Sequence, residues 1–269
     1  MRIIIRFLIV LISIICFSSC CFENGEKPAI PIREYSIQSV LWQQNAAEFK
    51  ALTYQSYFLA RLQLDKVLTK MASQNTKLAV VTDIDETVLN NSPFNGKLIE
   101  LDKPFSKDLW LEWGNLSNAD TIPGALEFFN YAADRGVEIF YISNRFAEQQ
   151  LVTINNLKKF GFPFADEKHV LLKVKTSEKD SRRKLVTDTH KVLLLLGDNL
   201  SDFSSIFDKQ GTKRRNALVD SLRYAFGNRF IVFPNPMYGD WENKGIYEGR
   251  YDWTPGQLDS IRHSKIQSY

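Results

Sequence analysis

Five short apolar runs recur along the chain and predict the strands of a sheet. They are rich in Val, Ile and Leu, and they span residues 78–82, 137–142, 170–174, 192–196 and 230–233. Continuous apolar runs of this length are typical of strands that are buried on both faces. We therefore expect a sheet that is covered by helices on both sides.

Segments with helical patterns lie between most of these runs. Residues 34–73 contain no Pro or Gly and carry apolar residues on an approximate helical face, which predicts one long or two shorter N-terminal helices. Further helices are predicted over 125–135, over 147–160 and, from a capping signal at Thr176-Ser177-Glu178, to about Thr187. This alternation predicts a Rossmann-like α/β fold with a mostly parallel sheet and right-handed crossovers.

A small insertion interrupts the alternation directly after the first strand. It covers about residues 90–118 and holds the aromatic residues Phe94, Phe105, Trp110 and Trp113. Ligands of open α/β sheets bind at the carboxyl ends of the strands. The insertion is therefore expected at the mouth of a binding site.

The N-terminus has the features of a secretory signal. Arg2 and Arg6 precede an apolar run, residues 7–17, whose length suits a signal peptide and is too short for a comfortable transmembrane helix. We therefore expect this segment to direct export and to take no part in the fold.

Small residues before Cys20 resemble a bacterial lipobox, in which the cysteine is acylated. Phe17 stands where leucine is usual, Cys21 is a weaker second choice, and an ordinary cleaved signal peptide is the alternative. We expect an exported protein that is lipid-anchored in the cell envelope. The outer membrane is favoured, because Cys20 is not followed by Asp. The expected parts are a lipoprotein signal peptide (1–19), a tether (20–33) and a folded domain (34–269) that contains the insertion.

Composition places the rest of the chain among ordinary globular domains. The 269 residues are 44% hydrophobic and 24% charged, enough for one full core. The formal net charge of +3 is small and argues against a nucleic-acid partner. All three cysteines precede Phe22, so an exported domain would fold without disulfides.

A pair of carboxylates ends the first strand. The run of residues 78–82 leads directly into Asp83-Ile84-Asp85-Glu86-Thr87. Burying two carboxylates is costly unless Mg²⁺ and a substrate phosphate balance them. We interpret Asp83 as a nucleophile that attacks phosphorus and Asp85 as a general acid, then base. A surface turn of acidic residues is the alternative, which the buried pattern of the strand disfavours.

Two later segments offer groups for a phosphate. Ser143 follows the second strand, where its hydroxyl can donate to a phosphoryl oxygen or serve as a helix N-cap. Lys179 could screen the charge of Asp83 from an incoming phosphate, although a single lysine is as compatible with a solvated helix face. Lys175 is the alternative lysine for this role.

The four-leucine run of residues 193–196 ends in a second acidic motif, Gly-Asp-Asn-Leu-Ser-Asp. Asp198 is expected to meet Asp83 across neighbouring strand ends and to bind the same hard cation. Asp202 could bind that cation through water or orient its ligands. A helix cap at Asp198 is the alternative.

The order of these elements resembles the haloacid dehalogenase superfamily of phosphohydrolases. The segments TDIDETVLNNSPF, YISNR, KTSEKDSRR, GDNLSDF and FPNPMYGDWE, behind a lipobox, are similar to the bacterial class C acid phosphatases, the lipoprotein 5′-nucleotidase family, over about residues 34–250. Ser201 departs from that family, where another acidic residue is expected.

The resemblance implies roles for individual residues. Asp83 would be nucleophile and Mg²⁺ ligand, Asp85 acid/base and ligand through its backbone carbonyl, and Asp198 the third protein ligand. Ser143 and Lys179 would hold the phosphate, Lys179 by its place in a Ser-x-Lys-x-x-Arg pattern.

Aromatic residues suggest a substrate that carries a flat ring. Tyr238, flanked by Pro236 and Gly239, matches the position where such enzymes stack the base of the substrate. Phe105, Trp110 and Trp113 could supply the opposite wall, because stacking is favourable and tolerates different bases. A core position is the alternative for any one of them.

Together these features predict an Mg²⁺-dependent phosphomonoesterase that acts on nucleoside 5′-monophosphates and related aromatic esters through an aspartyl phosphate. The alternatives are an envelope lipoprotein that binds a nucleotide or haem without catalysis, and a phosphatase for sugar or protein phosphates. The expected partners are a small phosphate monoester and, through the lipid, a membrane. Formation of a homo-oligomer is possible, and the sequence does not decide it.

Overall fold

The computed structural model describes residues 31–71 and 76–269. The predicted signal peptide, Cys20 and the tether up to residue 30 lie outside the described residues, and these parts of the domain organisation stay predictions. Within the two described ranges, every helix is too short or too polar to cross a bilayer.

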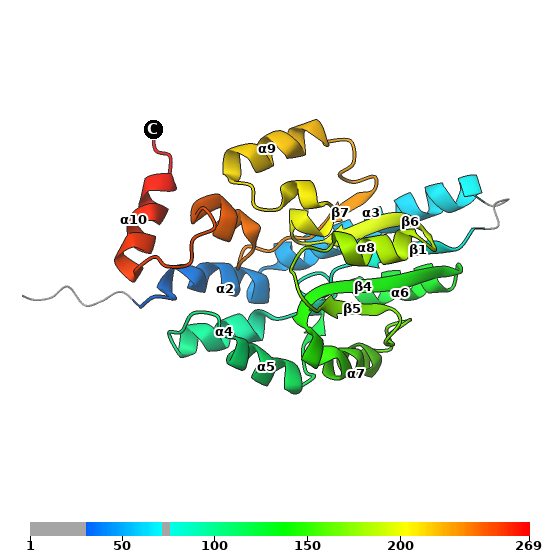
Figure 1. Cartoon of the computed structure of the whole chain (residues 1–269), viewed down its shortest axis with the longest axis horizontal. Helices are drawn as coiled ribbons and strands as arrows, with labels where there is room; N and C mark the ends of the chain where they lie inside the picture. The colour runs from blue at the N-terminus through cyan, green and yellow to red at the C-terminus, as the bar shows by residue number, and fades with distance from the viewer. Residues whose placement is uncertain (1–30, 72–75) are drawn as a thin grey trace, which may run out of the picture.

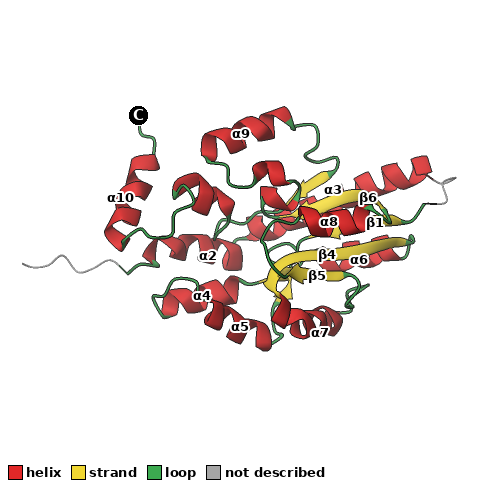
Figure 2. Cartoon of the chain, in the orientation of Figure 1, coloured by secondary structure: helices red, strands yellow, loops and turns green. Residues whose placement is uncertain are grey.

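A five-stranded parallel sheet forms the centre of the molecule (Figures 1 and 2). Every neighbouring pair of strands is parallel, so the prediction of a mostly parallel α/β sheet is confirmed. The strands, in spatial order, are β5 (Val170–Lys173), β4 (Val137–Phe146), β1 (Leu78–Thr82), β6 (Lys191–Gly197) and β7 (Phe230–Val232).

Both faces of the sheet are buried, as the continuous apolar strands require. Along β1, Val80 packs into one apolar cluster, whereas Ala79 and Val81 pack into another on the opposite face. The first cluster includes side chains of three helices, and the second includes Val186 of a fourth. These helices are α3 (Ala47–Met71), α6 (Ala125–Ala133), α7 (Gln150–Phe160) and, on the second face, α8 (Asp180–Thr187).

The N-terminal segment forms two consecutive helices, one of the two arrangements that its pattern allows. A short 3₁₀ turn (Glu34–Ser36) leads into α2 (Ile37–Asn45), and α3 follows. The break falls at Ala46, whose extended backbone (ψ 124°) ends α2. The long helix α3 then crosses the sheet, while α2 lies beyond the carboxyl ends of the strands (Figure 1).

The predicted start of the helix after β5 is wrong. Helix α8 begins at Asp180 and not at Thr176. The preceding residues stay non-helical, because the backbone carbonyls of Ser177 and Glu178 accept hydrogen bonds from the side chain of Arg182 (3.4 and 3.3 Å).

The insertion after β1 forms a small helical layer. Strands β2 (Leu89–Asn90) and β3 (Asp120–Thr121) pair antiparallel at its base. Between them lie α4 (Ser92–Glu100) and α5 (Lys107–Asn115), which share an apolar cluster around Trp110.

The last part of the chain adds helices that were not predicted individually from the sequence. The later helices lie beside the sheet edge and beyond its carboxyl end (Figure 1). They are the 3₁₀ turns Leu200–Asp202 (η3) and Ser205–Phe207, helix α9 (Thr212–Ser221), the π-helical turn η5 (Trp241–Ile246) and α10 (Pro255–Lys265). The 3₁₀ turn Ala147–Gln149 instead begins the predicted helix over 147–160 and leads into α7.

Truncation of a leucine in the middle of β6 is expected to destabilise the fold strongly. Leu194 is fully buried, so Leu194→Ala should lower the free energy of unfolding by about 2–5 kcal/mol. Urea denaturation measures this loss. Leu185→Ala, at an exposed position of α8, is the matched control, and an equal loss in both variants would contradict the account of the core.

Candidate active site

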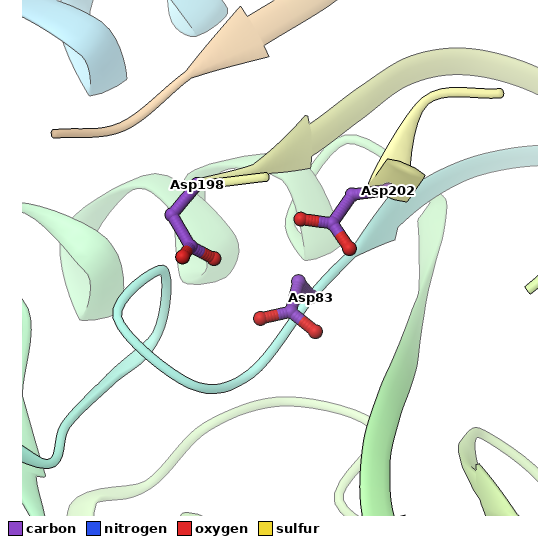
Figure 3. A group of neighbouring side chains, drawn as sticks. All are labelled: Asp83, Asp198 and Asp202. Atoms are coloured by element: carbon purple, nitrogen blue, oxygen red, sulfur yellow. The ribbon is translucent and has the colours of Figure 1, made fainter. Parts of the chain in front are cut away.

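Three carboxylates converge at the carboxyl ends of β1 and β6. Asp83 directly follows β1, Asp198 directly follows β6, and Asp202 lies in η3. Each offers an oxygen, and these oxygens lie within 4.8 Å of one another. Figure 3 shows the three side chains turned toward a common centre. The backbone N–H of Asp83 donates to the carbonyl of Leu196 (2.9 Å), which fixes the relative height of the two strand ends.

Lys179 brings an ammonium group into contact with this cluster. Its ammonium group forms ion pairs with Asp83 and, at 2.7 Å, with Asp202, and its side chain is 5% exposed. One lysine cannot balance three carboxylates. The remaining negative charge and the set of oxygen donors fit a divalent hard cation such as Mg²⁺.

Burial and mutual repulsion shift the titration of the cluster. Burial raises the pKa of Asp83 to about 7, and the charges of Asp202 and Asp85 act in the same direction, against Lys179. Burial also raises the pKa of Asp198 well above its ordinary value, with repulsion from Asp202 and Asp83. Burial disfavours the charged form of Lys179, but its two carboxylate partners outweigh this and raise its pKa. The cluster therefore has a high affinity for positive charge.

Asp85 lies in a separate cage of donors. Its carboxylate accepts hydrogen bonds from Ser143 Oγ (3.0 Å), Asn91 Nδ2 (2.9 Å) and Arg145 Nε (2.9 Å). Arg145 also forms an ion pair with it (2.8 Å) and has a side chain only 2% exposed. The side chain of Asp85 is thus held beside Asp83 and faces the same cavity.

Strand β4 runs on to Phe146, beyond its predicted end at Ile142, so Ser143 lies within the last residues of the strand and is fully buried. Its hydroxyl donates to Asp85 and accepts the backbone N–H of Arg145 (3.0 Å). Arg182 holds this strand end by donating to the carbonyl of Ser143 and to Asn144 Oδ1 (2.7 Å). The phosphate-binding roles of Ser143 and Lys179 stay predictions.

Sequence reasoning missed Arg145 and Asn91. Arg145 lies near the carboxyl end of β4, a few residues beyond the apolar run 137–142, and a cation at that place was a usable signal. Asn91 carried no such signal, because its place beside Asp85 depends on the fold of the loop after β1. Ser201, which departs from the family pattern, lines the cavity. Its backbone carbonyl accepts a hydrogen bond from Arg183 (3.0 Å).

A cavity of about 760 Å³ opens above the carboxylates, and its walls are aromatic. Asp83, Asp85, Asp198 and Lys179 are among the residues of its floor. The predicted aromatic residues Phe105, Trp110 and Tyr238 line it. Further aromatic rings that were not predicted as part of its walls also line it. These are Tyr35, Phe94, Phe146, Tyr247, Tyr251 and Trp253.

The predicted stacking role of Trp113 needs correction. Among the described residues, Trp113 is not part of the lining of this cavity. Its ring packs against the apolar clusters, and its Nε1 donates to Asn91 Oδ1 (2.8 Å). Trp113 therefore lies behind Asn91 and supports the cage of Asp85.

Comparisons with known proteins agree with this geometry. The family model described as HAD superfamily, subfamily IIIB (acid phosphatase) matches residues 28–241. The structure of the class C acid phosphatase from Bacillus anthracis is 40% identical, with a TM-score of 0.84 over 89% of this chain and all of that one. The same enzyme with tungstate bound gives 41% identity and a TM-score of 0.85, with the same coverage.

Plant proteins are more distant relatives. The stem 28 kDa glycoprotein of Glycine max is 29% identical over 193 residues, which cover 68% of this chain and 70% of that protein. Vegetative storage protein 2 of Arabidopsis thaliana is 25% identical over 218 residues, 77% of this chain and 69% of that protein.

Because the carboxyl pKa values are raised, we predict that the folded protein becomes less stable as the pH rises and that a bound cation offsets this loss. Between the ordinary value of 3.8 and about 7, folded Asp83 keeps a proton that the unfolded chain has lost. The contribution of this proton to the stability of the folded protein is therefore complete below the ordinary pKa of 3.8 and is lost as the pH rises to about 7. In EDTA, the melting temperature should be lower at pH 8 than at pH 5, and Mg²⁺ should raise it more at pH 8.

Thermal scans of the protein at both pH values, with EDTA or Mg²⁺, measure this effect. Asp198→Asn is expected to reduce both the loss in EDTA and the gain with Mg²⁺. A melting temperature in EDTA that rises from pH 5 to pH 8, together with no response to Mg²⁺, would contradict the charge imbalance of the cluster.

Proposed function

The chain belongs to subfamily IIIB of the HAD superfamily and is an acid phosphatase, and we propose that it is an Mg²⁺-dependent enzyme for nucleoside 5′-monophosphates and related aromatic phosphate esters. One observation carries this proposal: a buried carboxylate cluster forms the floor of a cavity with aromatic walls. A binder without catalysis would have no need for Asp83 facing an incoming phosphate. The membership in a phosphatase family also argues against that alternative.

The proposed reaction has two steps. A carboxylate oxygen of Asp83 attacks phosphorus, the ester P–O bond breaks, and Asp85 gives its proton to the leaving alkoxide. Water then attacks the phosphorus of the aspartyl phosphate, the P–O bond to Asp83 breaks, and Asp85 takes up the proton that the water gives up. Inorganic phosphate leaves, and both carboxyl groups return to their starting states.

The other residues of the site hold the reacting groups. Asp83, Asp198 and the backbone carbonyl of Asp85 would hold Mg²⁺, which supplies positive charge for the transferred phosphoryl group. Lys179 reduces the repulsion between Asp83 and an anionic substrate, and Asp202 fixes the position of its ammonium group (2.7 Å). Because donors surround Asp85, its carboxyl stays close to the position of the leaving oxygen.

The walls of the cavity support an aromatic leaving group. A nucleobase gains about 1–3 kcal/mol from stacking on one aromatic ring, whichever base it is. Phe105 is 56% exposed and Tyr238 lines the inner part of the cavity, so both rings are accessible to a ligand. Such a site favours flat groups over sugars.

The proposed location rests on the sequence alone. The basic residues Arg2 and Arg6, the apolar run and the lipobox-like residues before Cys20 support export and a lipid anchor in the envelope. Nucleotides cross membranes poorly, so phosphate removal outside the cell membrane would prepare nucleosides for uptake.

Removal of the nucleophile is expected to abolish turnover. Asp83→Asn should lower kcat for AMP at least about a thousandfold, because the amide cannot attack phosphorus, and EDTA should inhibit the unaltered protein. Phosphate release by residues 22–269 measures both effects. Asp134→Asn, an exposed position after α6, is the control and should retain full activity. Full activity of Asp83→Asn would contradict the mechanism.

The aromatic walls predict a substrate ranking. AMP and nicotinamide mononucleotide should have a higher kcat/KM than glucose 6-phosphate. Phe105→Ala should reduce this preference about tenfold, the loss of one stacking contact. Initial rates over a range of substrate concentrations give the values. A higher kcat/KM for glucose 6-phosphate than for AMP would instead favour a sugar phosphatase.

A further inference from the structure

Glu86 is a fully buried carboxylate beside the reaction centre that the proposed reaction does not use. Its side chain accepts hydrogen bonds from three neutral donors in three parts of the chain. Gln43 Nε2 comes from α2, the backbone N–H of Asn91 from the loop after β1 (3.0 Å), and the hydroxyl of Tyr238 from the loop after β7 (3.1 Å). Glu86 therefore joins segments that are distant in the sequence.

The backbone at Glu86 is strained, which points to a function. Its φ is +63°, in the left-handed region that costs a residue with a Cβ about 1–2 kcal/mol. Such conformations persist where the surroundings determine them, and they cluster at ligand sites. Here the N–H of Glu86 donates to the carbonyl of Leu89 (2.8 Å), and this turn directs the side chain into the interior.

Tyr238 connects this network to the cavity. Its ring lines the cavity, and its hydroxyl donates to Glu86. The loop that carries it is held by Asn235, whose Nδ2 donates to Asp198 (2.8 Å) and whose Oδ1 accepts the N–H of Met237 (3.0 Å). These bonds fix the backbone, while the bond to Glu86 holds the hydroxyl end of the ring, so the side chain cannot swing away from the wall.

We propose that Glu86 is a positioning residue that sets substrate specificity, because it holds the ring of Tyr238 as a flat wall against an aromatic leaving group. The inference rests on the proposed function. Stacking depends on the orientation of the ring, so a tyrosine that is free to rotate offers a weaker wall. Glu86 thereby favours aromatic over aliphatic phosphate esters without contact with the substrate.

The same carboxylate links the wall to the acid/base group. Glu86 accepts the N–H of Asn91, and Asn91 Nδ2 donates to Asp85 (2.9 Å). A variant of Glu86 can therefore also lower kcat for every substrate through Asp85. The ratio of kcat/KM for AMP to that for β-glycerophosphate separates the two effects, because a loss at Asp85 cancels in the ratio.

The test compares this ratio among variants. Tyr238→Phe removes only the hydroxyl, and we expect it to lower the ratio about fivefold through KM for AMP. Glu86→Leu should lower the ratio to a similar extent, and the double variant should lower it no further than either single change. Glu86→Gln keeps an oxygen toward Tyr238 and should retain most of the ratio.

A control and a second measurement exclude a merely structural role. Tyr141→Phe removes another buried hydroxyl, which donates to the carbonyl of Pro163 (2.8 Å) in the core, and it should leave the ratio unchanged. Thermal scans show which variants fold. If Glu86→Leu does not fold, Tyr238→Phe and Glu86→Gln still decide the question.

The outcomes distinguish this inference from the proposed function. An unaltered protein without preference for AMP over β-glycerophosphate would overturn both. A clear preference that Tyr238→Phe leaves intact would overturn the positioning role alone. A ratio that falls in Tyr238→Phe and is retained in Glu86→Gln would support it.

Discussion

The burial of three carboxylates against a single lysine is the constraint on which the rest of the site depends. Asp83, Asp198 and Asp202 repel one another at the base of a cavity, and Lys179 balances only part of their charge. Such an arrangement is unfavourable for the folded protein by itself. It becomes favourable when positive charge enters, so the stability that the fold gives up here appears as affinity for a cation and for the phosphoryl group beside it.

The parallel sheet makes this concentration of charge feasible. Asp83 and Asp198 are far apart in the sequence but follow adjacent strands, β1 and β6, whose register brings both to the same height. Apolar helices on both faces stabilise the strands enough to tolerate repulsion at their ends. The layer of the insertion and the C-terminal helices then cover this edge with aromatic side chains, so that the charged floor and the flat walls belong to one cavity.

The elements set by local pattern could be predicted from the sequence, and those set by tertiary contacts could not. The apolar runs gave all five strands, and the acidic motifs after β1 and β6 gave the carboxylates, because each signal lies within a few residues. The start of α8 depends on Arg182, whose side chain bonds the carbonyls of Ser177 and Glu178 and also that of Ser143 in β4. The turn of Trp113 toward Asn91 depends on the packing of α5. Arg145 and Glu86 were visible as charged residues, but their partners come from other segments, so their burial could not be anticipated.

The most direct measurement is rapid acid quenching of the protein during turnover of AMP with Mg²⁺, followed by mass spectrometry of its peptides. The account predicts a phosphoryl group on the peptide that contains Asp83, formed in the first turnover and absent in Asp83→Asn. Turnover at an unchanged rate in Asp83→Asn, or a phosphoryl group on a peptide without Asp83, would contradict it.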